Sequence, residues 1–96
     1  MSNQYKVAVV GATGAVGETM LSILAERRFP ISELVALASE RSAGGYVDFR
    51  DDEVLVQDLA TFDPSGVDIA LFSAGGAVSK EYAPKFAAAG VVVIDN

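Results

Sequence analysis

The fold of this chain is decided by residues 7–17, which read Val7-Ala8-Val9-Val10-Gly11-Ala12-Thr13-Gly14-Ala15-Val16-Gly17. The apolar run at 7–10 is typical of a strand buried on both faces of a parallel sheet. Glycines then recur with the spacing G-x-x-G-x-x-G, and the residues from Glu18 onward continue as a predicted helix. A strand, a glycine turn and a helix in this order can bind a nucleotide phosphate.

The reason lies in the backbone of the turn. The first amides of a helix have no partner within the helix, and the helix dipole makes that end partly positive, so a pyrophosphate can satisfy both. In the usual form of this loop each glycine has one role: Gly11 makes the tight turn, Gly14 admits the pyrophosphate and Gly17 lets the helix pack on the strand. The spacing is one residue longer than in the commoner fingerprint, and the alternative is a flexible surface turn. The position between a strand and a helix favours nucleotide binding.

The first half of the chain predicts one βαβ unit with a right-handed crossover. A strand is expected at 5–10 and a helix at 15–28, where an apolar stripe repeats with helical spacing and Pro30 ends the helix. A second buried strand is expected at 34–38. Two short antiparallel strands at 46–50 and 53–57, joined by a turn at Asp51-Asp52, are then expected to form a hairpin at an edge of the sheet.

The second half repeats the strand and helix pattern. A core strand is expected at 67–72 and a helix at 78–89, with Ser79 as its cap and Pro84 kinking it or delaying its start. Gly90 should end that helix before a last strand at 91–94. The expected fold is a single α/β domain spanning 1–96, with a Rossmann-like, mostly parallel, doubly wound sheet and an inserted β-hairpin.

Ligands of a doubly wound sheet collect at the carboxyl ends of its strands. The loops expected there cover 11–17, 39–45, 73–76 and 95–96, and three of them are rich in glycine or small polar residues. This composition suits one extended dinucleotide. The turn at 73–76 is interpreted either as a flat backbone surface under the cofactor, with Ser73 as a hydrogen-bond donor, or as a plain strand-to-helix turn.

The loop after the second strand normally decides between NAD and NADP. An acid there binds the ribose hydroxyls, whereas arginine and hydroxyl groups accept a 2′-phosphate. The chain offers both Glu40 and Arg41, and Ser39, Arg41 and Ser42 together suit a phosphate dianion. With Glu40 pointing to solvent, NADP is the expected cofactor. The alternative is an ordinary solvated Glu40-Arg41 charge pair.

Composition excludes several classes of function. The formal net charge is −6, which argues against a nucleic-acid-binding surface. Neither cysteine nor histidine occurs in the 96 residues, so no catalytic residue and no metal site is predicted. The N-terminal residues resemble neither a signal sequence nor a membrane span, and a cytoplasmic location with no membrane partner is expected.

The assembled motifs resemble the N-terminal part of the bacterial aspartate-semialdehyde dehydrogenase family. The resemblance spans the whole chain and is carried by VAVVGATGAVG (7–17), ERRFP (26–30), LASERSAG (37–44), VDIALFSAGG (67–76), KEYAP (80–84) and AAGVVVIDN (88–96). It implies an NADPH-linked conversion of aspartyl phosphate to aspartate semialdehyde, on the route to lysine, threonine, methionine and diaminopimelate. It also implies a homodimer.

By the same resemblance, residues 13–16 should meet the pyrophosphate, Arg41 and Ser42 the 2′-phosphate, and residues 73–76 should lie along the cofactor. The full set of expected cofactor-binding residues is Gly11, Thr13, Gly14, Ala15, Val16, Gly17, Ser39, Arg41, Ser42, Ser73, Ala74, Gly75 and Gly76.

One departure from the family pattern limits what the chain can do. The family uses a cysteine nucleophile and a proton-handling histidine, and neither lies in these residues. The chain is therefore interpreted as an inactive cofactor-binding fragment of a longer two-domain enzyme. Two alternatives remain, a non-catalytic nucleotide-binding module and an N-acetyl-glutamyl-phosphate reductase, although residues 41–44 and 71–75 speak against the second.

Overall fold

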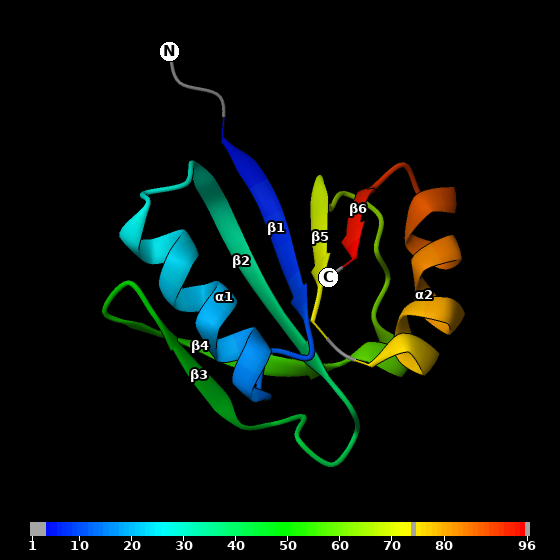
Figure 1. The fold of residues 1–96 in the computed structure, drawn as a ribbon, viewed down its shortest axis with the longest axis horizontal. Helices are drawn as coiled ribbons and strands as arrows, with labels where there is room; N and C mark the ends of the chain where they lie inside the picture. The colour runs from blue at the N-terminus through cyan, green and yellow to red at the C-terminus, as the bar shows by residue number, and fades with distance from the viewer. Residues whose placement is uncertain (1–3, 74, 96) are drawn as a thin grey trace.

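A computed structural model describes residues 4–73 and 75–95, and its centre is a six-stranded sheet with the order β3-β4-β2-β1-β5-β6 (Figure 1). All neighbouring strands are parallel except the β3-β4 pair. The strands are β1 (Tyr5–Val10), β2 (Ile31–Ala38), β3 (Tyr46–Phe49), β4 (Asp52–Asp58), β5 (Ile69–Phe72) and β6 (Val92–Asp95). The expected α/β class with a mostly parallel sheet is confirmed.

Helices α1 (Ala15–Glu26) and α2 (Gly76–Ala88) cover opposite faces of this sheet (Figure 1). The side chains of β1 alternate between two cores. Val7 and Val9 are buried in the same cluster as Leu21 of α1, whereas Ala8 and Val10 share a cluster with Phe86 of α2. Burial on both faces explains why β1 is a continuous apolar run, and it makes the sheet doubly wound as expected.

The chain reverses its direction of travel across the sheet at β1. From β1 it moves to β2 and β4 on one side, and it then returns to β5 on the other side. Val10 is paired with Leu37 of β2 and with Phe72 of β5, so the carboxyl ends of three strands lie side by side. Such a switch point is where open α/β sheets form their ligand sites.

The hairpin lies at an edge of the sheet as expected, but it was predicted with the wrong turn. Phe49 pairs with Asp52, so the turn is Arg50-Asp51, and both turn residues have positive φ (51° and 68°). Positive φ at both central residues is typical of a type I′ turn, whose twist matches that of the flanking strands in a two-residue hairpin. β4 also pairs in parallel with β2, so the hairpin extends the main sheet and only β3 lies at the edge.

Helix boundaries also differ from the expectation. α1 ends at Glu26 rather than residue 28, because Arg28 has a left-handed backbone (φ 53°) and the Phe29 amide donates to the Leu24 carbonyl. α2 begins at Gly76 with Gly75 as its N-cap, so Ser79 is not the cap.

Ser79 instead lies buried within the helix, where its hydroxyl is 3.0 Å from the Asp95 carboxylate of β6. Pro84 does not delay the start of α2, since it lies in the second half of that helix. The last strand includes Asp95, which was expected in a loop.

Arg50 ties the hairpin to the C-terminus of α1. Its guanidinium donates to the carbonyls of Phe29 and Leu24 (3.4 Å for the latter) and lies 4.9 Å from the centre of the Phe49 ring. Because Leu24 is one of the last four helical residues, its carbonyl is among those that helix geometry leaves without a regular partner beyond the C-terminus.

We expect Arg50→Ala to lower the free energy of unfolding by about 1 kcal/mol, the net value of such hydrogen bonds. Urea unfolding followed by circular dichroism would measure the change. Arg27→Ala is the matched control, since that arginine lies at the same helix end and has no side-chain hydrogen bond among the described residues. Equal losses in the two variants would show that Arg50 does not clamp the helix.

Candidate functional site

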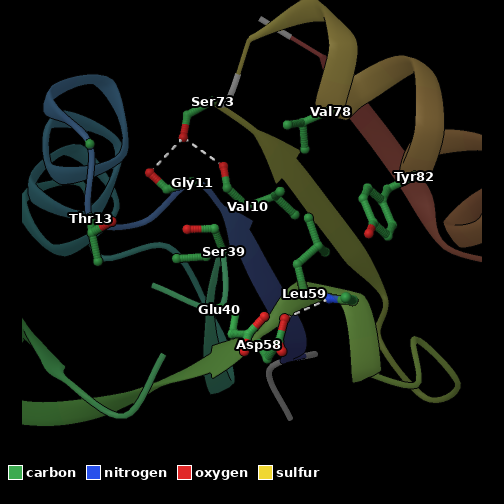
Figure 2. Close-up of a pocket in the computed structure, with 13 residues that line it drawn as sticks. Val10, Gly11, Thr13, Ser39, Glu40, Asp58, Leu59, Ser73, Val78 and Tyr82 are labelled. Atoms are coloured by element: carbon green, nitrogen blue, oxygen red, sulfur yellow. Dashed lines mark hydrogen bonds between the residues drawn. The ribbon is translucent and has the colours of Figure 1, made fainter. Parts of the chain in front are cut away.

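A cavity of about 480 Å³ opens at the carboxyl ends of β1, β2 and β5, at the switch point of the sheet. The residues drawn in Figure 2 come from five separate chain segments that meet around it. The lining residues are Val10, Gly11, Thr13, Gly14, Ala38, Ser39, Glu40, Asp58, Leu59, Ala60, Ser73, Val78 and Tyr82.

The glycine loop between β1 and α1 has the backbone that its sequence predicted. Gly11 has a φ of 85°, a left-handed conformation that favours glycine. Its amide, and that of Ala12, donate to the Leu37 carbonyl at 2.8 and 3.1 Å, so the loop is anchored on β2. A Cβ atom on Gly17 would lie 2.1 Å from the Gly11 carbonyl oxygen. Gly17 therefore permits the close packing of α1 on the loop.

The N-terminus of α1 has no side-chain cap. Gly14 is the N-cap, its backbone is extended, and its carbonyl accepts the amide of Glu18 at 2.9 Å. Among the described residues, the amides of Ala15, Val16 and Gly17 donate no hydrogen bond. These amides, at the positive end of the helix dipole, are the groups that bind an anion in this type of loop.

Ser73, at the end of β5, joins that strand to the glycine loop. Its hydroxyl lies 2.7 Å from the Val10 carbonyl oxygen and 3.2 Å from that of Gly11, as the dashed lines in Figure 2 mark. A serine hydroxyl has one proton, and both neighbours can only accept. The Ser73 proton is therefore shared between two backbone carbonyls in this structure, and a hydrogen bond from Ser73 to a cofactor stays a prediction.

The loop after β2 contributes only its first two residues to the cavity wall. Ser39 and Glu40 line the cavity, whereas Arg41 and Ser42 do not. The Ser39 carbonyl accepts the amides of Ser42 and Ala43 at 2.9 and 3.0 Å, which turns the chain back toward β4. Glu40, expected to point to solvent, is exposed but contributes to the cavity wall.

Other expected site residues lie beside the cavity rather than in its wall. Ala15 and Val16 are exposed in the first turn of α1, and Gly17 is buried beneath it. Gly75 and Gly76 are exposed at the start of α2 and do not line the cavity. Ala74 lies outside the described residues.

The sequence reasoning missed one wall of the cavity. The 3₁₀ helix η1 (Leu59–Thr61) contributes Leu59 and Ala60, and α2 contributes Val78 and Tyr82. Asp58 caps η1, because its carboxylate accepts the Ala60 amide at 3.0 Å. The available signal was the spacing of four residues between Val78 and Tyr82, which places both on one face of a helix.

Tyr82 and Phe86 lie four residues apart in α2, but the structure gives them different surroundings. Phe86 is fully buried and packs edge-on against Phe72 at 5.4 Å. Tyr82 is half-buried and turns its ring toward the cavity (Figure 2). Partial burial, followed by the nearby carboxylates of Glu81 and Asp58, raises the pKa of Tyr82. The phenol is therefore neutral at physiological pH and can donate a hydrogen bond.

The cavity wall contains groups that can bind a ligand through apolar contacts and hydrogen bonds. It combines apolar side chains, a neutral phenol and two carboxylates, and the N-terminus of α1 begins directly after the lining residue Gly14. Within residues 4–73 and 75–95, no three potential metal ligands of the His, Cys, Asp or Glu type cluster together. Neither described helix is long and apolar enough to cross a membrane.

Residues 6–96 match the family model described as semialdehyde dehydrogenase, NAD binding domain. The chain belongs to this family. Its curated relatives include the aspartate-semialdehyde dehydrogenase of Legionella pneumophila, 68% identical over 96 residues, and aspartate-semialdehyde dehydrogenase 2 of Vibrio cholerae, 60% identical over 96 residues. Both alignments cover all of this chain and 28% of the relative.

Solved structures agree with this assignment. Aspartate semialdehyde dehydrogenase II of Vibrio cholerae, described as complexed with ASA, has a TM-score of 0.95 at 60% identity, over 98% of this chain and 31% of its own. The Candida albicans aspartate semialdehyde dehydrogenase, described with NADP, has a TM-score of 0.74 at 22% identity, over 98% of this chain and 30% of its own. The second likeness shows the fold alone. The semialdehyde dehydrogenase NAD-binding domain therefore occupies nearly the whole chain, which spans less than a third of these relatives.

Proposed function

We propose that this chain is the NADP-binding part of an aspartate-semialdehyde dehydrogenase. The observation that carries the proposal is the uncapped N-terminus of α1, which begins beside the glycine loop that lines the 480 Å³ cavity. The names of the relatives support the substrate, since each of the proteins compared above is an aspartate-semialdehyde dehydrogenase. None of these relatives bears the name of an N-acetyl-glutamyl-phosphate reductase or of a non-catalytic module.

In this proposal the pyrophosphate of the cofactor accepts hydrogen bonds from the amides of Ala15, Val16 and Gly17. Gly14 fits the approach of the phosphates, because a Cβ there would have only the Gly11 carbonyl oxygen nearby, at 3.6 Å, and otherwise faces the cavity. The apolar wall of Leu59, Val78 and Tyr82 suits the flat face of the adenine ring. Ser73, Gly75 and Gly76 are proposed from the family resemblance to lie along the nicotinamide half.

NADP is proposed over NAD because Arg41 and Ser42 immediately follow the cavity residues of the second loop. A guanidinium fork and a hydroxyl form charge-assisted hydrogen bonds with a 2′-phosphate. Glu40 favours the opposite choice, since a carboxylate at the cavity wall binds ribose hydroxyls. The two cofactors therefore have to be compared directly.

The reaction itself is proposed for a longer protein that contains this domain. Bound NADPH supplies a hydride, and the reductive dephosphorylation of aspartyl phosphate to aspartate semialdehyde needs a nucleophile that these 96 residues do not contain. An exposed apolar strip on β6, with Val92 at 60% and Ile94 at 50% exposure, supports a further domain packed on this one. A homodimer, a cytoplasmic location and a role in lysine, threonine, methionine and diaminopimelate synthesis are proposed from the family resemblance.

Calorimetric titration of the chain with NADPH tests the proposal, and Gly14→Ala provides the decisive variant. The added methyl group meets no closer contact than 3.6 Å, so we expect the midpoint of thermal unfolding to be nearly unchanged. It occupies the approach of the pyrophosphate, so we expect NADPH affinity to fall about tenfold or more, a loss of at least one good hydrogen bond.

Adenosine is the control ligand, because it lacks phosphate and should bind Gly14→Ala and the parent chain alike. If the parent chain fails to bind NADPH, or if Gly14→Ala binds it at full strength, nucleotide binding at this loop is wrong.

A further inference from the structure

The Gly11 carbonyl oxygen is the point on which the glycine loop is organised. It accepts the Gly14 amide at 3.1 Å and the Ser73 hydroxyl at 3.2 Å, and it lies directly against the Cα of Gly17. The orientation of this one peptide therefore fixes the turn, the N-cap of α1 and the contact between them. Anything that holds the Gly11 carbonyl in place also aims the free amides of α1.

Ser73 is the side chain that holds it. Its backbone amide and its hydroxyl both donate to the Val10 carbonyl, at 2.9 and 2.7 Å, and the hydroxyl is shared with the next carbonyl, that of Gly11. The end of β5 is thus bonded to both peptides through which β1 passes into the loop. These bonds join residues 62 and 63 positions apart in the sequence, so the loop is held from outside its own segment.

We propose that Ser73 is a positioning residue that presets the phosphate-binding loop by holding the Gly11 carbonyl, and that it binds the cofactor only indirectly. The inference rests on the proposed function, because it assigns the pyrophosphate to the loop that Ser73 holds. Its physical basis is preorganisation: a loop already fixed in its binding conformation loses less conformational entropy when the anion binds.

The proposal predicts a selective defect. Ser73→Ala should weaken ligands that place a pyrophosphate on the loop and spare ligands that do not. We expect 2′-phospho-ADP-ribose and NADP to lose affinity by the same factor, about three- to tenfold, the net value of one hydrogen bond. Binding of 2′-phosphoadenosine, which carries no 5′-phosphate, should stay unchanged. Ser73→Thr keeps the hydroxyl and should restore the affinities of the parent chain.

The matched control is Ser79→Ala. It removes a serine hydroxyl that also makes a part-buried hydrogen bond, to Asp95 at 3.0 Å, in a helix that neighbours the same strand. A general loss of stability would affect both variants alike and would weaken all three ligands together. A selective pyrophosphate defect in Ser73→Ala and none in Ser79→Ala separates positioning from stability.

The experiment combines calorimetry for the three ligands with amide hydrogen exchange of the chain in the absence of ligand. We expect faster exchange of the Gly14 amide in Ser73→Ala, because its acceptor is released, and parent-like exchange in Ser73→Thr. Unchanged Gly14 exchange in Ser73→Ala would overturn the inference, as would equal weakening of all three ligands or a loss confined to NADP. If the parent chain binds none of the ligands, the proposed function fails, and Gly14 exchange alone still decides the role of Ser73.

Discussion

Replacing Gly17 with alanine is expected to lower the free energy of unfolding by about 3 kcal/mol or more, at the upper end of the overpacking range. The new Cβ atom would lie 2.1 Å from the Gly11 carbonyl oxygen and 2.8 Å from the Cα of Ala12. Both neighbours are backbone atoms, so no flexible side chain can move aside. α1 would have to lift from the loop, which would also misplace the amides proposed to bind the pyrophosphate.

Urea unfolding followed by circular dichroism measures the loss, and Gly76→Ala is the control. Gly76 is the first residue of α2, and a Cβ there would meet nothing within 4 Å. Its replacement should leave stability unchanged or raise it by up to about 1 kcal/mol through helix propensity. A Gly17→Ala variant as stable as Gly76→Ala would contradict the close packing of α1 on the loop.

Replacing Arg41 with alanine is expected to lower NADP affinity by about ten- to hundredfold, the value of a charge-assisted hydrogen bond to the 2′-phosphate. NAD affinity should change little, because NAD carries a hydroxyl at that position. Competitive binding of the two cofactors to each variant measures both effects. The parent chain should prefer NADP, and Arg41→Ala should lose that preference.

Two variants make this result interpretable. Arg27→Ala removes the same charge near the C-terminal end of α1, away from the cavity, and controls for net charge. Glu40→Gln removes the carboxylate at the cavity wall, which should weaken NAD more than NADP if the acid binds ribose hydroxyls. Equal affinity of the parent chain for both cofactors, or full NADP affinity in Arg41→Ala, would overturn the choice of NADP.

Much of the fold could be predicted because local patterns and tertiary packing agree. β1 was predicted with the correct bounds, since an apolar run before a glycine turn has few other solutions. The errors lie where contacts distant in sequence compete with local signals. β2 begins three residues earlier than expected, because the Tyr5 amide of β1 donates to the Pro30 carbonyl and extends the pairing to Ile31.

In the candidate site, too, the part that depends on local sequence was predicted and the part that depends on distant contacts was not. The glycine loop follows from its own residues, because a positive φ at Gly11 and a close approach at Gly17 each require glycine locally. The wall of η1 and α2 was missed, because Leu59 and Tyr82 come together at the cavity only when η1 and α2 both pack on the sheet.

By itself, the sequence determined the α/β class, the glycine turn between β1 and α1, and the absence of a cysteine or histidine nucleophile from these residues. Only the tertiary structure decided that the Ser73 proton is used within the protein, that Glu40 rather than Arg41 lines the cavity, and that β4 joins the main sheet. The physical reason is the distance along the sequence over which each feature is determined. Backbone conformation and burial pattern are encoded in neighbouring residues, whereas a hydrogen-bond partner or a cavity wall depends on which distant segments the fold brings together.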